Sequence, residues 1–257
     1  MDLKECKIGI IGLGQMGIGI ATNLINAGYS ITGYDLKSDA IQSLAKIGGK
    51  ATESSEDIVA SCDVVLTCVE GRDSIQIADT ILLPKARSDQ IFIDHSTVPA
   101  PETRRIGQAF IEKSCKYLDA PISGGKEGAA KGMLRIFVGG DKATADQCWE
   151  LFEVIGNIDK VVYCGAIGMG QVAKVVQQLT GRFPNVARLE VMVFGLRAGL
   201  DLDTLMRALD VSPDSSDQYA WLYKAIKSGD AEKTTEDALR RPEPSIWNEL
   251  MRRQRKN

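Results

Sequence analysis

Histidine is almost absent from this sequence of 257 residues, which contains only one, His95. A single histidine leaves little material for a metal site built from histidines or for a triad of serine, histidine and aspartate. The six cysteines are scattered and form no C-x-x-C pair. We therefore predict reduced thiols, no metal site and a cytoplasmic location.

Long apolar runs and a strong net charge are also missing. No stretch approaches the roughly 20 apolar residues that a membrane span needs. The apolar run after the charged start MDLKECK is too short for the core of a signal peptide. The net charge of −3 provides no basic field that would attract nucleic acid. We therefore expect neither a membrane nor a nucleic acid as partner.

Short apolar strand patterns alternate with helical patterns over the first two thirds of the chain. We expect strands near 7–11, 30–34, 63–69, 90–94, 117–119, 134–138 and 160–163, and helices near 38–46, 73–81, 101–114 and 142–155. Several of these strands are continuous apolar runs, which are typical of a parallel sheet buried on both faces. The alternation predicts a doubly wound α/β sheet.

A glycine-rich turn, Gly12-Leu13-Gly14-Gln15-Met16-Gly17, follows the first strand and opens a helix. The pattern G-x-G-x-x-G is weak evidence alone, but here it stands where a dinucleotide-binding turn needs it. Gly12 would permit the tight turn, Gly14 would let the backbone approach a pyrophosphate, and Gly17 would let helix and sheet pack closely. The N–H groups at the helix start would bind the phosphates.

An acidic residue, Asp35, ends the second strand at the spacing expected for a ribose-binding carboxylate. Such a carboxylate accepts hydrogen bonds from the ribose diol and repels a 2′-phosphate, which favours NAD over NADP. Lys37 lies nearby and keeps NADP open as an alternative. The strands, the glycine turn and this acid together predict a Rossmann domain at 1–164.

Beyond Gly165 the strand patterns stop. Helical patterns cover about 169–198, 201–210 and 217–228, which predicts a smaller all-helical domain at 165–257. Gly181 and Pro184 interrupt the first of these helices. Because proline removes one backbone hydrogen bond and clashes with the carbonyl four residues back, we expect a kink near 180–184.

Two further segments carry candidate chemistry. The first is the turn DAPISGG at 119–125, where Ser123 precedes Gly124 and Gly125 and could present a hydroxyl and bare N–H groups to a carboxylate. The second is the glycine-rich start of a helix that carries Lys174 among apolar residues. A lysine that loses solvation has a lowered pKa, which suits proton transfer near neutral pH.

At these segments the sequence resembles the β-hydroxyacid dehydrogenase family, which includes 3-hydroxyisobutyrate dehydrogenase, tartronate semialdehyde reductase and, more distantly, 6-phosphogluconate dehydrogenase. The matching segments are IGLGQMG, the strand CDVVLTCV, the D-x-S-T segment Asp94-His95-Ser96-Thr97, the DAPISGG turn and the GxGxxxK helix. They occur in the family's order over roughly residues 5–230, and their joint occurrence is highly specific.

The resemblance implies hydride transfer between NAD, or NADP, and a small β-hydroxy acid or aldehyde acid. Lys174 would exchange the proton of the substrate hydroxyl. The substrate would be bound by Ser123, Gly124, Gly125, Gln177 and Gln178. Besides the glycine turn and Asp35, the cofactor would contact Cys68, Val69 and Thr97. His95 would be a loop residue without a catalytic role.

Some features depart from the family pattern. Gln177 and Gln178 stand where the family has asparagine, and Glu70 brings a carboxylate into the loop after the fourth strand. Residues 231–257 match the family in no register, so we expect a shortened C-terminal domain that lacks part of the family's dimer surface. A homodimer is still one of the expected states of assembly. Glu70, Pro184 and the short C-terminal domain favour an alternative, a dinucleotide-binding protein with little or no turnover, whereas the retained Ser123 and Lys174 favour the enzyme.

Overall fold

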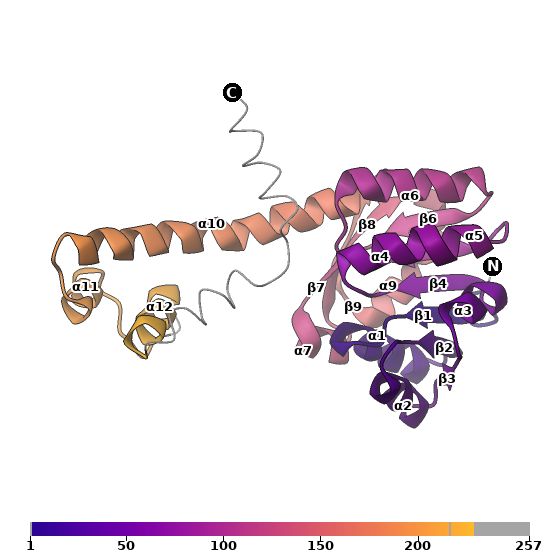
Figure 1. The fold of residues 1–257 in the computed structure, drawn as a ribbon, viewed down its shortest axis with the longest axis horizontal. Coiled ribbons are helices and arrows are strands. Elements are labelled where there is room, and N and C mark those ends of the chain that lie inside the picture. The colour runs from indigo at the N-terminus through magenta and orange to yellow at the C-terminus, as the bar shows by residue number, and fades with distance from the viewer. Residues whose placement is uncertain (1, 216, 229–257) are drawn as a thin grey trace. The chain divides into compact units, whose positions relative to one another are not determined.

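The computed structural model describes residues 2–215 and 217–228 (Figure 1). The chain divides into two compact units, Met1–Val175 and Val176–Asn257. The division falls within helix α10 (Met169–Arg197), further along the chain than the predicted one after residue 164. The part of the predicted helical domain beyond residue 228 lies outside the described residues.

In the described part of the first unit, a nine-stranded sheet has the order β3-β2-β1-β4-β5-β6-β8-β7, with β9 paired to β8 (Figure 1). From β3 to β6 neighbouring strands are parallel, whereas β8 is antiparallel to β6 and β7. The predicted doubly wound α/β sheet is confirmed. The strands are β1 (Ile8–Ile11), β2 (Ile31–Tyr34), β3 (Lys50–Ala51), β4 (Val64–Thr67), β5 (Ile91–Asp94), β6 (Lys116–Asp119), β7 (Ile122–Ser123), β8 (Leu134–Gly140) and β9 (Gly156–Gly165).

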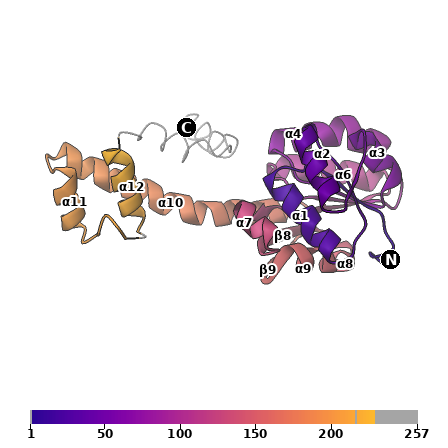
Figure 2. The ribbon, with the colours of Figure 1, turned by 90° about the horizontal axis from the view of Figure 1, so that it is seen from below.

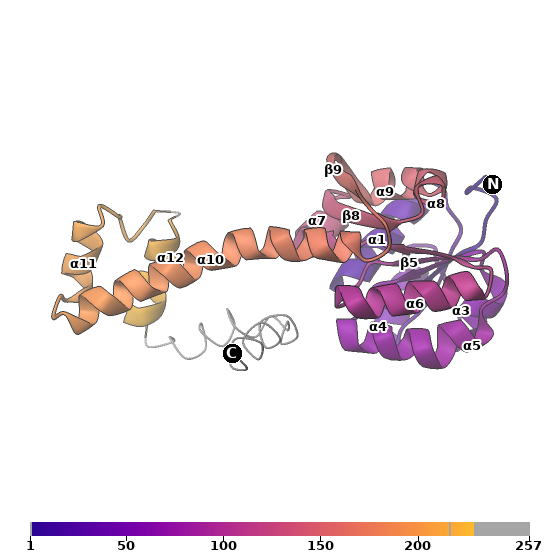
Figure 3. The same cartoon turned by 90° about the horizontal axis from the view of Figure 1, so that it is seen from above.

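Helices cover both faces of this sheet, as Figure 2 and Figure 3 show. One apolar layer joins the sheet to α1 and α9, with Leu24 and Phe152 fully buried. The other joins it to α3 and α6 through Ile58 and Phe110. The helices of this unit are α1 (Gln15–Asn26), α2 (Ser38–Lys46), α3 (Ser55–Ser61), α4 (Gly71–Ile77), the π-helical turn η1 (Ala78–Leu82), α5 (Leu83–Lys85), α6 (Ala100–Glu112), α7 (Gly125–Ala130), α8 (Lys142–Gln147), α9 (Trp149–Ile155) and the start of α10. Burial on both faces explains why β1, β4 and β5 are apolar at nearly every position.

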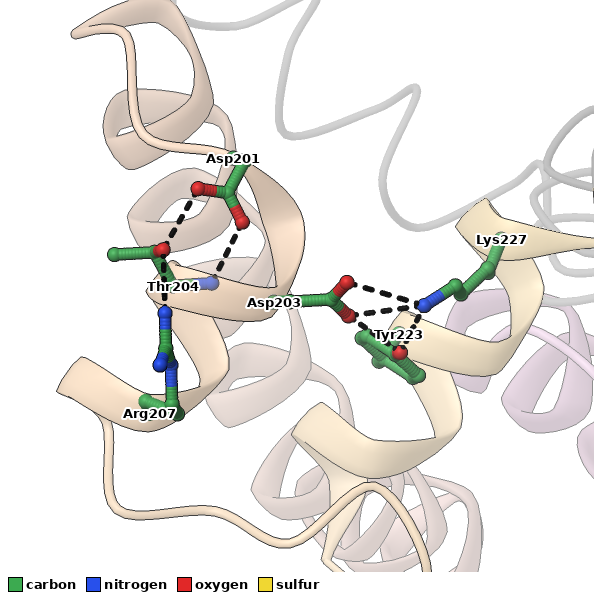
Figure 4. A network of polar contacts seen from close by, with 6 residues as sticks. All are labelled: Asp201, Asp203, Thr204, Arg207, Tyr223 and Lys227. Atoms are coloured by element: carbon green, nitrogen blue, oxygen red, sulfur yellow. Dashed lines mark hydrogen bonds and ion pairs between the residues drawn. The ribbon is translucent and has the colours of Figure 1, made fainter.

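The remainder of α10, α11 (Leu202–Ala208) and α12 (Gln218–Lys227) form the described part of the second unit. Met192, Leu205 and Leu222 belong to its small apolar core. The carboxylate of Asp203 on α11 accepts hydrogen bonds from the Tyr223 hydroxyl at 2.6 Å and the Lys227 ammonium at 3.0 Å, which ties α11 to α12 (Figure 4). The predicted helical character of this region is confirmed.

Residues 169–197 form one helix that includes Gly181 and Pro184, so neither residue ends it, and the kink expected near 180–184 stays a prediction. Proline removes one N–H donor and strains the preceding turn. The intact turns on either side of it can continue the helix, because adding a residue to an existing helix is far easier than starting a new one.

A bilayer-spanning segment was not expected, and among the helices of the described residues none combines the length and apolar character needed to cross a membrane.

The stacked aromatic side chains behind the sheet provide a test of the core. Phe110 is fully buried, and its ring centroid lies 4.2 Å from that of Phe92 and 5.4 Å from that of Tyr117. We expect Phe110→Ala to lower the free energy of unfolding by about 3–5 kcal/mol in urea denaturation, since it leaves a cavity. Ile111→Ala, on the exposed face of the same helix, should change it by about 0.5 kcal/mol or less. Equal losses would contradict this assignment of the core.

Candidate functional site

The carboxyl ends of the parallel strands are aligned along one edge of the sheet. The register pairs Ile11 with both Tyr34 and Thr67, Thr67 with Asp94, and Asp94 with Asp119. The strand order reverses at β1, which has β2 on one side and β4 on the other. Ligands of doubly wound sheets bind outside the carboxyl ends at such a reversal. This edge, called the carboxyl edge below, is therefore the candidate site.

The glycine turn lies directly at the reversal, between β1 and α1. Gly12 has a φ of 94°, and a Cβ there would lie 2.4 Å from the Cys68 carbonyl oxygen. A Cβ at Gly17 would lie 2.0 Å from the Gly12 carbonyl oxygen. A Cβ at Gly14 would meet no atom within 4 Å. Backbone packing thus requires two of the glycines, whereas Gly14 leaves bare backbone facing open space, which fits a pyrophosphate at the start of α1.

Asp35 follows β2 and borders the glycine turn. One carboxylate oxygen accepts the Leu13 N–H at 2.7 Å, and the other accepts the Lys37 N–H at 2.8 Å. These bonds hold the half-buried carboxylate beside the turn. Each oxygen keeps a further lone pair, so Asp35 also fits a ribose diol. The ribose role of Asp35 stays a prediction, and its bond to the Leu13 N–H, which fixes the turn, was not expected.

A buried carboxylate, Asp94, fixes the loops that follow β4 and β5. It accepts hydrogen bonds from the Thr67 and Ser74 hydroxyls, both at 2.8 Å, and from the Ser96 N–H at 2.9 Å. The Ser96 hydroxyl in turn accepts the Val69 N–H at 3.1 Å. The D-x-S-T segment was recognised as a motif, but the sequence did not predict that Asp94 holds the two loops by hydrogen bonds.

Three residues predicted to contact the cofactor lie on these loops. Cys68 and Val69 follow β4, Thr97 lies in the loop after β5, and all three are half-buried. Desolvation, with a contribution from Asp94, raises the pKa of the Cys68 thiol to about 12. The thiol is therefore neutral at physiological pH. Glu70, on the exposed side of the β4 loop, precedes α4.

His95 is buried rather than exposed in its loop. Its Nδ1 lies 2.9 Å from the Ala120 carbonyl oxygen, which can only accept, so Nδ1 donates a proton. Burial lowers the pKa of the imidazole, which favours the neutral form. His95 therefore joins the ends of β5 and β6.

The predicted substrate-binding turn follows β6. Ser123 is half-buried in β7 and pairs with Arg135 of β8. Gly124 and Gly125 have φ values of 147° and 63°, a conformation that a side chain would strain. A Cβ at Gly125 would meet no atom within 4 Å. The backbone of Gly125 is therefore accessible to a ligand at the start of α7, whereas a Cβ at Gly124 would lie 3.1 Å from the Leu134 side chain.

Lys174 lies in the first unit, and its exposed fraction is only 6%. Few lysines are buried to this extent. One turn earlier, the side-chain amide of Gln171 donates to the Ser96 carbonyl oxygen at 2.9 Å and accepts the Val98 N–H at 3.1 Å. Residues three apart share a helix face, so Lys174 extends from the face of α10 that is bound to the β5 loop.

The structure thus gathers the glycine turn, Asp35, the β4 and β5 loops and the start of α10 at the carboxyl edge. Gln177 and Gln178 are half-buried and lie just beyond the division between the two units, and their contact with the substrate stays a prediction. Asp94, Asp119, Ser96 and Gln171 were missed as site residues. All four lie within the recognised motifs, and only the fold shows which atoms they bind.

A doubly wound sheet with this glycine turn and acid defines a Rossmann-type dinucleotide-binding protein. Residues 7–168 match the family model described as the NAD binding domain of 6-phosphogluconate dehydrogenase, which confirms the predicted NAD-binding domain. The chain belongs to the β-hydroxyacid dehydrogenase family, as its motifs indicated.

Named relatives lie within this family. The chain is 34% identical over 202 residues to an NAD-dependent L-serine dehydrogenase of Pseudomonas aeruginosa, a match that covers 77% of this chain and 67% of the relative. It is 30% identical over 234 residues to 2-(hydroxymethyl)glutarate dehydrogenase of Eubacterium barkeri, covering 88% and 76%. The structure resembles Mycobacterium tuberculosis 3-hydroxyisobutyrate dehydrogenase with L-serine, with a TM-score of 0.69, 32% identity and coverage of 78% and 70%.

The second and third glycines of the turn, Gly14 and Gly17, should respond differently to alanine. Gly17→Ala would force a Cβ against a backbone oxygen, so we expect a loss of about 1–3 kcal/mol in the free energy of unfolding. Gly14→Ala faces open space and should lose less than about 1 kcal/mol. Thermal and urea denaturation of both variants measure the difference. A Gly14→Ala protein as unstable as Gly17→Ala would contradict the geometry of the turn.

Proposed function

We propose that this protein is an NAD(P)-dependent oxidoreductase that transfers a hydride between nicotinamide and a small β-hydroxy acid. The observation that carries the proposal is the buried Lys174, on a helix whose first turn is bound to the carboxyl edge beside the dinucleotide turn. A buried lysine at the ligand-binding edge of a Rossmann sheet is a candidate general acid or base.

The substrate class follows from what the relatives' names share. L-Serine, 3-hydroxyisobutyrate and 2-(hydroxymethyl)glutarate are all carboxylates that bear a hydroxymethyl group on the carbon next to the carboxyl group. They differ only in the second substituent on that carbon. We therefore infer that the substrate is a 3-hydroxypropanoate substituted at carbon 2, and that its oxidation gives the corresponding aldehyde acid.

The cofactor is NAD, with NADP as the alternative. The bare backbone at Gly14 and the start of α1 would hold the pyrophosphate, and Asp35 would accept the ribose diol. Cys68, Val69 and Thr97 would line the remainder of the site. When bound, the nicotinamide accepts or supplies the hydride.

The protein would bind the substrate carboxylate at the turn after β6. The Ser123 hydroxyl and the backbone N–H groups of Gly124 and Gly125 are the donors available there. Gln177 and Gln178, with amide groups one methylene further out than asparagine, would bind the substrate hydroxyl. Holding both ends of the molecule fixes the reacting carbon, which is the main contribution of such positioning to the rate.

Lys174 would move the proton. During oxidation the substrate loses a hydride from carbon and a proton from oxygen, and the neutral amine of Lys174 takes that proton. During reduction the ammonium returns it to the oxygen of the aldehyde. Burial of Lys174 keeps bulk water away from this exchange.

Cellular location and assembly belong to the same proposal. All six cysteines are free thiols in the structure, which supports a cytoplasmic location. The second unit exposes apolar side chains on α10, among them Phe183, Val186 and Phe194. Such side chains are typical of an interface and support a homodimer.

A panel of aldehyde acids tests the activity. Methylmalonate semialdehyde, tartronate semialdehyde and glyoxylate are offered with NADH and with NADPH, and L-serine and 3-hydroxyisobutyrate with NAD. We expect turnover on a substituted 3-carbon acid, and a decrease in kcat of about 10²–10⁴-fold in Lys174→Ala with NADH binding retained. Lys142→Ala, an exposed lysine on α8, serves as the control. NADH binding without turnover on every compound would favour the alternative, a dinucleotide-binding protein without catalysis.

Cofactor preference depends on the charge of Asp35. Asp35→Asn keeps the size of the side chain and removes its repulsion of a 2′-phosphate. We expect the KM for NAD to rise, and that for NADP to fall or stay constant, so that their ratio shifts by about 10-fold or more, the factor for one hydrogen bond to a charged group. Asp39→Asn, in the first turn of α2, is the matched control. An equal change for both cofactors would remove the ribose role.

A further inference from the structure

A second buried carboxylate at the carboxyl edge, Asp119, binds the amino end of α10. It ends β6 and is fully buried. One of its oxygens accepts the Gly168 N–H at 2.7 Å, and the other accepts the Gln171 N–H at 3.0 Å. The N–H groups at a helix start have no partner within the helix. Asp119 therefore caps α10 from a strand 49 residues away.

Glycines allow the helix start to lie directly on the sheet. A Cβ at Gly139 would lie 2.5 Å from the Asp119 carboxylate and 2.8 Å from the Gly170 nitrogen. A Cβ at Gly170 would lie 2.3 Å from the Phe137 carbonyl oxygen. Side chains at these positions would force α10 off β8. The close approach therefore leaves the carboxylate little freedom to move.

Gln171 provides a second attachment on the same turn. Its backbone N–H binds Asp119, and its side chain bridges the Ser96 carbonyl oxygen and the Val98 N–H. The first turn of α10 is thus fixed to the ends of β5 and β6 at once. Lys174 follows one turn later and is buried.

We propose that Asp119 is a positioning residue, whose carboxylate holds the first turn of α10 on the carboxyl edge and thereby fixes Lys174 there. The catalytic consequence rests on the proposed function. The attachment itself does not, and it is measurable without any substrate. No step of the reaction places a proton or a charge on Asp119, which acts only through the helix.

The ionisation state of Asp119 gives the attachment a dependence on pH. Burial raises the pKa of Asp119 from its ordinary value of 3.8 to about 7, and the N–H groups of Gly168 and Gln171 oppose this shift. The negative charge of Asp94 adds to it. Only the ionised form offers both oxygens as acceptors. The attachment should therefore weaken as the pH falls through about 7.

The stability of the whole fold responds in the opposite sense. Because the folded-state pKa lies above the ordinary value, protonated Asp119 favours folding, and this contribution is lost as the pH rises through about 7. Local order at the start of α10 and global stability therefore change in opposite directions with pH. Hydrogen exchange measures the first and denaturation measures the second. The other titratable or charged groups near the carboxylate and the turn it holds are Asp94, His95 and Arg104, the neutral Tyr117 and Cys164, and Lys174 itself.

Hydrogen exchange on Asp119→Asn tests the proposal. The amide has the same shape but one acceptor oxygen, so one of the two bonds to α10 is lost. We expect amide exchange of residues 168–174 to accelerate by about 10- to 100-fold, the factor for one hydrogen bond to a charged group. Asp141→Asn is the matched control, because Asp141 caps α8 through the Thr144 N–H at 2.8 Å. It should leave exchange at 168–174 unchanged.

Activity gives a second readout that separates positioning from general destabilisation. For Asp119→Asn we expect kcat to fall by about 10-fold or more, with the KM for NADH within about twofold. We expect the rate of the wild-type protein to fall below about pH 7 as Asp119 is protonated, and we expect the Asp119→Asn profile to lack this step. A general loss of folded protein would change the amplitude of the pH profile and keep its shape.

The outcomes are distinguishable. Unchanged exchange at 168–174 in Asp119→Asn overturns the proposal. Accelerated exchange in a protein whose wild type turns over no substrate supports the attachment and contradicts the proposed function. If the variant does not fold, hydrogen exchange of the wild-type protein at two pH values tests the proposal instead. After correction for intrinsic chemical exchange, 168–174 should exchange faster at pH 6 than at pH 8, and a constant rate overturns the proposal.

Discussion

The hydrogen bonds between the Asp119 carboxylate and the amino end of α10 join the sheet to the helix that carries the buried lysine. Without this junction, the register of the sheet would still align the glycine turn, Asp35 and the loops after β4 and β5. The amino end of α10 would then be held to the carboxyl edge by the side-chain bonds of Gln171 and by apolar packing, which is less directional than hydrogen bonding. The account of the site therefore depends on two backbone N–H groups and one buried carboxylate.

Three carboxylates at the carboxyl edge share one physical feature. Asp35, Asp94 and Asp119 each accept hydrogen bonds from backbone N–H groups or hydroxyls. Such bonds compensate for the desolvation of a charged group. The carboxylates therefore act as fixed supports for loops and helix starts.

The sequence predicted the elements whose signals are local. Continuous apolar strands, the glycine turn with its tight φ at Gly12, Asp35 and the buried Lys174 all correspond to patterns within a few residues. The short α3 was missed because its buried apolar residues Ile58 and Val59 are adjacent and do not recur at helical spacing. The expected helix at 142–155 divides at Cys148 into α8 and α9. Strand β9 is longer than expected, since its polar residues Asn157 to Lys160 lack the apolar pattern of a buried strand.

The residues that hold the site together, Asp119 and Gln171, could not be predicted from the sequence for a different reason. Asp119 binds residues 49 and 52 positions away, and Gln171 binds residues 73 and 75 positions away. No local pattern encodes such partners, which become apparent only once the sheet brings the strand ends together. The roles of Ser123, Gln177 and Gln178 as substrate ligands stay predictions.

The fate of the transferred hydrogen tests the central claim most directly. The protein is incubated with methylmalonate semialdehyde and NADH in which both hydrogens at carbon 4 of the nicotinamide are deuterium, and the product is analysed by mass spectrometry and NMR. We expect one deuterium on the hydroxymethyl carbon of the resulting hydroxy acid, which forms about 10²–10⁴-fold more slowly when Lys174 is replaced by alanine. An absence of deuterium in the products of this and the other aldehyde acids, with NADH bound, would contradict it.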